Sequence, residues 1–217
     1  MSRNKTVELV NHWSVFETTH PDGGIGDFCR HYLANQQQKI QGPLVGGVVP
    51  PINDGLLLKI IGRISRLNMN YANLALKGTG LNQIEEFGIL LNIKQERNPK
   101  KTAIIYANLS ELSSGIDMLA RMKKRGLIKD YEDKEDKRSK RVELTAKGEK
   151  VTDICFLKIK RTALMLMNDL TNDDKELCIQ LLKNVEIKFS TLWQRHKGRE
   201  FEEIYKEVVG DTKTPLH

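Results

Sequence analysis

The sequence is poor in cysteine and offers no pattern for a metal or disulfide site. Its three cysteines, Cys29, Cys155 and Cys178, lie far apart and form no C-x-x-C pair. This spacing excludes the usual zinc sites and a disulfide framework, and it favours a reducing compartment. The five histidines share no ligand spacing either. We therefore expect neither a metal nor another cofactor.

The sequence also has few aromatic residues and no long apolar run. Aromatics make up 6% of the chain, which argues against a sugar-binding cleft or a stacking platform for single-stranded nucleic acid. No stretch approaches the roughly 18 to 20 apolar residues of a membrane span. Asn4 and Glu8 lie near the start of the chain, where a signal peptide needs an unbroken apolar run. The expectation is a cytoplasmic protein without a membrane partner.

Catalytic signatures are missing as well. Residues 23–26 are glycine-rich, but no strand precedes them and no Gly-Lys-Ser/Thr follows, which argues against a phosphate loop. The Ser113-Ser114 pair has no histidine nearby in the sequence. We expect no catalytic residues and no enzymatic activity.

Charge is abundant, and cations are in excess. Lys and Arg number 35 against 28 Asp and Glu, which gives a net charge of +7. An excess of this kind suits a polyanionic partner, although many basic proteins never bind nucleic acid. The surplus is concentrated between Arg121 and Arg141, where ten cations stand among five anions. Taken alone, such a run is most often a solvated face.

The spacing of apolar residues predicts a mostly helical chain, because they recur at steps of three and four. On the helix 54–78, for example, these steps predict a core stripe of Leu57, Ile60, Ile64, Leu67, Tyr71 and Leu74. The predicted helices span 7–16, 27–38, 54–78, 83–97, 101–108, 112–125, 146–169, 171–197 and 200–209, and the predicted strands span 127–132 and 141–144.

Capping residues mark several of these boundaries. Asn82 is the expected N-cap of the helix 83–97, with Glu85 three residues on as a variant capping box. Gly126 is the expected C-cap glycine of the helix 112–125, and Thr145 is the expected N-cap of the helix 146–169.

The order of the elements in the middle of the chain is that of a winged helix-turn-helix. A helix, a short helix, a turn, an amphipathic helix, a charged hairpin and a long helix follow one another. The predicted fold class is therefore mainly α with a small two-stranded β wing. Residues 1–53 form an N-terminal extension of short helices and an irregular arm at 42–53. Residues 198–217 form a C-terminal tail.

The amphipathic helix 112–125 is the candidate recognition helix. Its predicted buried face carries Leu112, Ile116, Leu119 and Met122. The opposite face has small polar residues first and cations later, as a helix in a major groove requires near base edges and phosphates. The residues of this opposite face are Ser113, Ser114, Asp117, Arg121 and Lys124.

Three segments of this region resemble the MarR (multiple antibiotic resistance regulator) family. Residues 113–128 read SSGIDMLARMKKRGLI, residues 136–138 read DKR, and residues 142–148 read VELTAKG. The family has a serine-started recognition helix ending in Lys/Arg-Gly-Leu-Ile, an Asp-x-Arg in the wing and a Leu-Thr-x-x-Gly entry to the next helix. The resemblance covers 54–197, with dimerisation helices at 54–78 and 146–197 and the winged helix-turn-helix at about 82–145.

The resemblance implies a transcriptional regulator that binds double-stranded DNA as a homodimer, acts as a repressor on a palindromic operator, and responds to a small-molecule effector. It places Ser113, Ser114, Asp117 and Arg121 in the major groove, with Asp117 either accepting from cytosine or avoiding the DNA. It implies further roles in the wing. There Arg138 reaches the minor groove, Asp136 orients it, and Lys137, Lys140 and Arg141 hold the DNA backbone.

Two other interpretations remain at this stage. The first is a winged-helix module that binds an acidic protein and no DNA. The second is a redox-sensing regulator that uses Cys29, a role that requires an exposed thiol with a lowered pKa; the alternative for Cys29 is a buried or idle thiol. Trp13, Trp193, Met165 and Met167 could line a ligand cavity, but core packing is the simpler expectation.

Overall fold

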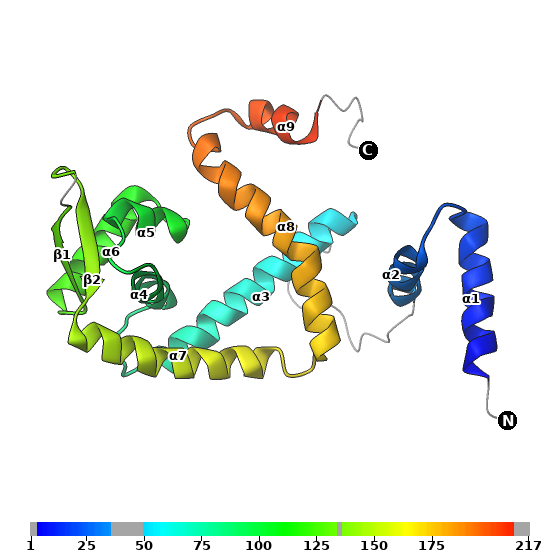
Figure 1. Cartoon of the computed structure of the whole chain (residues 1–217), viewed down its shortest axis with the longest axis horizontal. Helices are drawn as coiled ribbons and strands as arrows, with labels where there is room; N and C mark the ends of the chain where they lie inside the picture. Colours follow the sequence, from blue (N-terminus) through cyan, green and yellow to red (C-terminus); the bar gives the residue numbers. More distant parts are fainter. Residues whose placement is uncertain (1–3, 36–49, 134–135, 211–217) are drawn as a thin grey trace. The chain divides into compact units, whose positions relative to one another are not determined.

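The computed structural model describes residues 4–35, 50–133 and 136–210. It divides into two compact units, Met1–Leu56 and Leu57–His217. Most of the predicted arm at 42–53, up to residue 49, lies outside the described residues. The described elements (Figure 1) are α1 (Lys5–Thr19), α2 (Ile25–Asn35), α3 (Asn53–Leu76), α4 (Ile84–Glu96), α5 (Lys101–Ala107), α6 (Leu112–Lys124), β1 (Ile128–Glu132), β2 (Lys140–Leu144), α7 (Ala146–Leu166), α8 (Asn172–His196) and α9 (Phe201–Val209).

The first unit is built on the helices α1 and α2, which are joined by residues 20–24, including the sequence Pro-Asp-Gly-Gly. Asn4 caps α1 by accepting from the Thr6 amide at 3.0 Å. The two helices meet through aromatic rings, since Phe28 lies edge-on to Phe16 and Trp13 with centroids 5.6 and 5.2 Å apart. A small aromatic cluster therefore holds this helical pair together.

The core of the second unit lies where α4, α5, α6 and the wing come together, with α7 packed against α4 (Figure 1). Its largest fully buried side chains come from each of these elements. They include Leu90 of α4, Ile104 and Ile105 of α5, Leu119 and Met122 of α6, and Val142 of β2. The predicted winged helix-turn-helix, mainly α with a two-stranded wing, is confirmed.

Two glycines, Gly126 and Gly148, allow the chain to enter and leave the wing. Gly126 ends α6 with a φ of +71°, and its amide donates to the Lys123 carbonyl at 2.9 Å. The strands β1 and β2 are antiparallel, from Ile128 opposite Leu144 to Glu132 opposite Lys140. A Cβ on Gly148 would lie 2.0 Å from the Leu127 carbonyl oxygen. The glycine of the Leu-Thr-x-x-Gly motif is therefore required by the close approach of α7 to the chain entering β1.

Of the two predicted N-caps, one is confirmed and one is wrong. The Thr145 hydroxyl accepts from the Gly148 amide at 3.0 Å, as expected of an N-cap. Thr171, where a helix was predicted to start, forms a capping box with Asp174. The N-cap of α4 is Gln83 and not Asn82. The Asn82 amide instead donates to the Glu86 carboxylate at 2.8 Å, so the acidic partner is Glu86 rather than the predicted Glu85.

The long helices α3 and α8 expose apolar stripes, and the sequence analysis assigned that of α3 to a core. On α3, Leu57, Ile64, Leu67, Tyr71 and Leu74 are exposed, while Ala72 and Leu76 are buried. The prediction of a core stripe is therefore wrong for the single chain. On α8, Leu181, Val185 and Phe189 are likewise exposed. None of the described helices has the length and apolar character needed to cross a membrane.

Candidate nucleic-acid interface

The outward face of α6 carries the polar and basic residues that the sequence analysis selected. Ser113, Ser114 and Asp117 are exposed on its first half, and Arg121 and Lys124 on its second. The buried residues of α6 are Gly115, Met118, Leu119 and Met122.

The predicted buried face of α6 is wrong at two positions. Leu112 and Ile116 are 38% and 46% exposed, whereas Gly115 and Met118 face the core. The reason is a close approach of α5: a Cβ at Gly115 would lie 2.5 Å from Cγ2 of Ile105. Because only glycine fits there, Gly115 must face inward, and this sets the rotation of the whole helix.

The tip of the wing is fixed by Asp136. Its carboxylate accepts from the Arg138 amide at 3.1 Å and from the Ser139 hydroxyl at 2.7 Å. These donors, the Ser139 hydroxyl first, hold the pKa of Asp136 below its usual value. Asp136 thus holds the backbone at Arg138, while the side chains of Lys137, Arg138 and Lys140 are exposed.

Arg141 differs from the other cations of the wing because its guanidinium is engaged within the protein. It donates to the Asp133 carboxylate at 2.5 Å and to the Asn98 carbonyl at 2.8 Å. Asp133 is buried. Arg141 therefore ties the part of β2 next to the wing turn to the loop between α4 and α5.

A second clamp, which the sequence analysis missed, joins the wing to the two helices of the helix-turn-helix. The nearly buried Asp130 carboxylate on β1 pairs with Lys123 of α6 and with Lys101 of α5 at 3.2 Å. The Lys123 ammonium, and after it Lys101, hold the pKa of Asp130 below its usual value against the opposing effect of burial.

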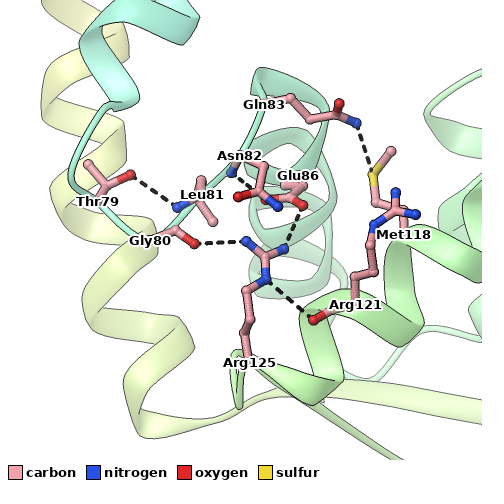
Figure 2. A network of polar contacts seen from close by, with 9 residues as sticks. All are labelled: Thr79, Gly80, Leu81, Asn82, Gln83, Glu86, Met118, Arg121 and Arg125. Atoms are coloured by element: carbon pink, nitrogen blue, oxygen red, sulfur yellow. Dashed lines mark hydrogen bonds and ion pairs between the residues drawn. The ribbon is translucent and has the colours of Figure 1, made fainter.

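A third contact, shown in Figure 2, fixes the end of α6. The Glu86 carboxylate is 1% exposed and pairs with Arg125 at 2.5 Å. The same guanidinium donates to the Gly80 carbonyl at 2.8 Å and the Arg121 carbonyl at 3.3 Å. Arg125 therefore connects the C-terminal end of α6 to the start of α4 and the turn before it. No local sequence signal reveals this pair, because the partners lie 39 residues apart.

The described cations from 121 to 141 thus fall into two groups. Members of the first group are in ion pairs: Lys123, Arg125, Lys129 and Arg141. Members of the second group are exposed and form no ion pair with any described residue: Arg121, Lys124, Lys137, Arg138 and Lys140. We call this second group the free cations.

The described part of the chain holds no cluster of three or more His, Cys, Asp or Glu side chains suited to a metal ion. Cys29 is exposed. Trp193 and Met165 are exposed in the single chain, which contradicts the expectation that they pack in its core.

Comparisons with known proteins agree with this geometry. Residues 84–148 match the family model described as a winged helix DNA-binding domain. The transcriptional regulator HosA of Escherichia coli O127:H6 is 30% identical over 100 residues, which span 46% of this chain and 74% of that protein.

Solved structures share the fold. A mutant MarR from Escherichia coli, crystallised with operator DNA, superposes with a TM-score of 0.56 at 22% identity, over 59% of this chain and 92% of that one. The PcaV transcriptional regulator from Streptomyces coelicolor, in complex with its natural ligand, gives a TM-score of 0.55 at 15% identity, over 65% of this chain and 96% of that one.

Proposed function

The chain belongs to the MarR family of winged helix transcriptional regulators, and from this premise we propose that it represses transcription by binding a palindromic operator as a homodimer. The observation that carries the proposal is the set of free cations on the outward side of α6 and the wing. Exposed cations that form no ion pair with the described residues are available to replace the counterions of DNA phosphates.

The outward residues of α6 are proposed to enter the major groove. Ser113 and Ser114 are short and lie at the start of the helix, where a recognition helix approaches base edges. Asp117 is exposed one turn further on, and a carboxylate there can accept from the cytosine amino group. Arg121 and Lys124 follow at the end of the helix, where cations meet phosphates.

The wing is proposed to bind beside the groove. Arg138 at its tip reaches the minor groove, and Lys137 and Lys140 bind phosphates. Asp136 fixes the turn through the Arg138 amide, so it presents the side chain of Arg138 rather than pairing with it. Arg141, held by Asp133 and the Asn98 carbonyl, supports the wing next to its turn.

The homodimer is proposed to bury the apolar stripes of α3 and α8. A large exposed apolar surface is rare on monomeric proteins and indicates an interface. Within the proposed MarR-like region, 54–197, the helices 54–78 and 146–197 then form the dimer core. Each subunit presents one winged helix-turn-helix, at about 82–145, to one half-site. The extension 1–53 and the tail 198–217 lie outside this region.

A small-molecule effector is part of the proposal, supported by the ligand complex of PcaV. The second unit has a cavity of about 450 Å³ beside α3 and the turn that leads into α4. This volume is within the usual range for small-molecule sites. The cavity is lined by Asn70, Asn73, Leu74, Lys77, Leu81 and Asn82.

The test is a comparison of two duplexes. The full-length protein is used to select a duplex of ~30 base pairs from a random-sequence library, long enough for two half-sites one turn apart. Its affinity is then compared with that of a scrambled duplex of equal composition. The proposal predicts at least ~1,000-fold tighter binding to the selected sequence. Equal binding to both would contradict a specific regulator, and no binding at low salt would favour a protein-interaction module.

A further inference from the structure

Ile116 is a large apolar side chain left exposed on the recognition helix. It is 46% exposed, although α6 buries Met118, Leu119 and Met122. On the same side of the helix, Ser113, three residues before it, and Ala120, four residues after it, are small and exposed. Leu112, four residues before it, is large and 38% exposed. Ile116 therefore projects beyond Ser113 and Ala120, with Leu112 beside it towards the start of the helix.

This exposure is imposed by the packing of α5 on α6. At Gly115, on the side of α6 that faces Ile105, there is no space for a side chain larger than that of glycine. A Cβ there would lie 2.5 Å from Cγ2 and 2.7 Å from Cγ1 of Ile105. Successive residues of a helix are separated by about 100° of rotation. Ile116 cannot turn into the core without moving Gly115 out of the one position that it fits.

The surroundings of Ile116 point to DNA as the occupant of this surface. The free cations Arg121 and Lys124 share the exposed side of α6, so a polyanion is drawn to it. The small side chains of Ser113 and Ala120 allow this side of the helix to approach DNA closely. In the major groove the one apolar group on a base edge is the C5-methyl group of thymine.

We propose that Ile116 determines specificity by packing against a thymine methyl group in each half-site. This inference rests on the proposed function, because it requires α6 to lie in the major groove. It adds an apolar determinant to a surface whose other candidate contacts are polar or charged. Removal of this contact is expected to change the preference at one position while the phosphate contacts remain.

The experiment replaces each thymine of the selected duplex in turn by deoxyuridine, which lacks only the methyl group. At the contacted position, wild-type affinity is expected to fall by about fourfold, the factor for one buried carbon group. In Ile116→Ala the same replacement is expected to change affinity by less than twofold. Ile116→Val keeps a branched apolar side chain, so its affinity is still expected to fall when the contacted thymine is replaced by deoxyuridine.

Leu112→Ala is the matched control, because Leu112 is the other exposed large apolar residue on α6. It is expected to keep full sensitivity at the position that Ile116 contacts. Loss of sensitivity in Leu112→Ala but not in Ile116→Ala would overturn the inference, as would specific binding without any effect of thymine methyl groups. The proposed function survives both results. Absence of sequence-specific binding by the wild type would overturn the proposed function and the inference together.

Discussion

The basic residues at the C-terminal end of α6 differ in whether they are paired within the protein. Arg125 is 26% exposed and pairs with a nearly inaccessible carboxylate, Glu86, whereas Arg121, one turn earlier, is exposed and forms no ion pair with the described residues. A buried carboxylate that loses its partner is costly, whereas an exposed cation contributes little to folding. The net charge of the region therefore overstates the charge available to a partner.

This difference in pairing predicts that Arg125→Ala affects mainly stability and that Arg121→Ala affects mainly DNA binding. Arg125→Ala is expected to lower the free energy of unfolding by about 2–3 kcal/mol, because Glu86 stays buried without its cation. Arg121→Ala is expected to change that free energy by less than about 0.5 kcal/mol and to weaken DNA binding. Urea unfolding and DNA titration of both variants provide the measurement. Equal loss of stability in the two variants would contradict the assignment.

At the scale of elements, the helix-turn-helix and the wing are fixed to each other at few points. Gly115 lets α5 lie against α6, and Asp130 of β1 pairs with Lys101 of α5 and Lys123 of α6. These contacts set the rotation of α6 and the position of the wing beside it. The orientation of the outward face therefore depends on residues that do not belong to it.

Gly115→Ala tests the close approach of α5 and α6. The added methyl group must displace Ile105, and overpacking of this kind costs about 1–3 kcal/mol of stability. Gly62→Ala is the control, because Gly62 lies on α3 and a Cβ there meets nothing within 4 Å. In that exposed helical position alanine is expected to stabilise by about 0.5–1 kcal/mol. Thermal unfolding of both variants measures the difference, and stabilisation by Gly115→Ala would contradict the packing described.

The Asp130 clamp predicts a dependence of stability on pH. Its pKa in the folded protein is lowered from the ordinary value of 3.8, so the clamp contributes fully above about that pH and its contribution is lost as the pH falls through the lowered pKa. Asp130→Asn is therefore expected to be less stable than the wild type at pH 7. Urea unfolding from pH 7 to pH 2.5 should show this difference shrinking on acidification. A difference that is constant over the range would exclude the ionised carboxylate as its cause.

At the scale of the whole molecule, the exposed stripes of α3 and α8 predict a second copy of the chain. Val185→Glu puts a charge in the middle of the α8 stripe, and the expected result is a monomer of 24.8 kDa in place of a species of twice that mass, with weaker operator binding. Gln180→Glu adds the same charge change at an exposed polar position of α8 and should leave the dimer intact. Sedimentation velocity distinguishes these outcomes. A wild-type monomer at all concentrations would refute the dimer.

The sequence predicted the elements well because their ends are encoded locally. Thr145, Thr171 and Gly126 each mark a boundary through a cap that depends on neighbouring residues alone. The exposed face of α6 was also predictable from charge and periodicity. The buried face of α6 was not predictable, because the apolar Ile116 fits the helical periodicity of a core residue. Only the close approach of Ile105 to Gly115 shows that Ile116 is exposed.

The remaining failures concern partners that are distant in the chain or belong to another chain. The ion pair of Glu86 and Arg125 joins the first turn of α4 to the C-terminal end of α6, and periodicity carries no information about such a pair. Likewise, an apolar stripe has the same pattern whether its cover comes from the same chain or from a second one. Leu67 and Tyr71 of α3 were assigned to a core for this reason, and they are exposed in the single chain.

The salt dependence of operator binding is the most direct test of whether the wing contacts DNA in a specific complex. The logarithm of the affinity of the selected duplex is measured against the logarithm of salt concentration for the wild type, Arg138→Ala and a control, Lys160→Ala, whose side chain is exposed on α7. A steep slope is expected for the wild type. If Arg138 contacts DNA, Arg138→Ala binds more weakly, and its slope is smaller by about one unit per half-site. Lys160→Ala should match the wild type. An unchanged affinity and slope in Arg138→Ala would remove the wing from the DNA interface and contradict the account.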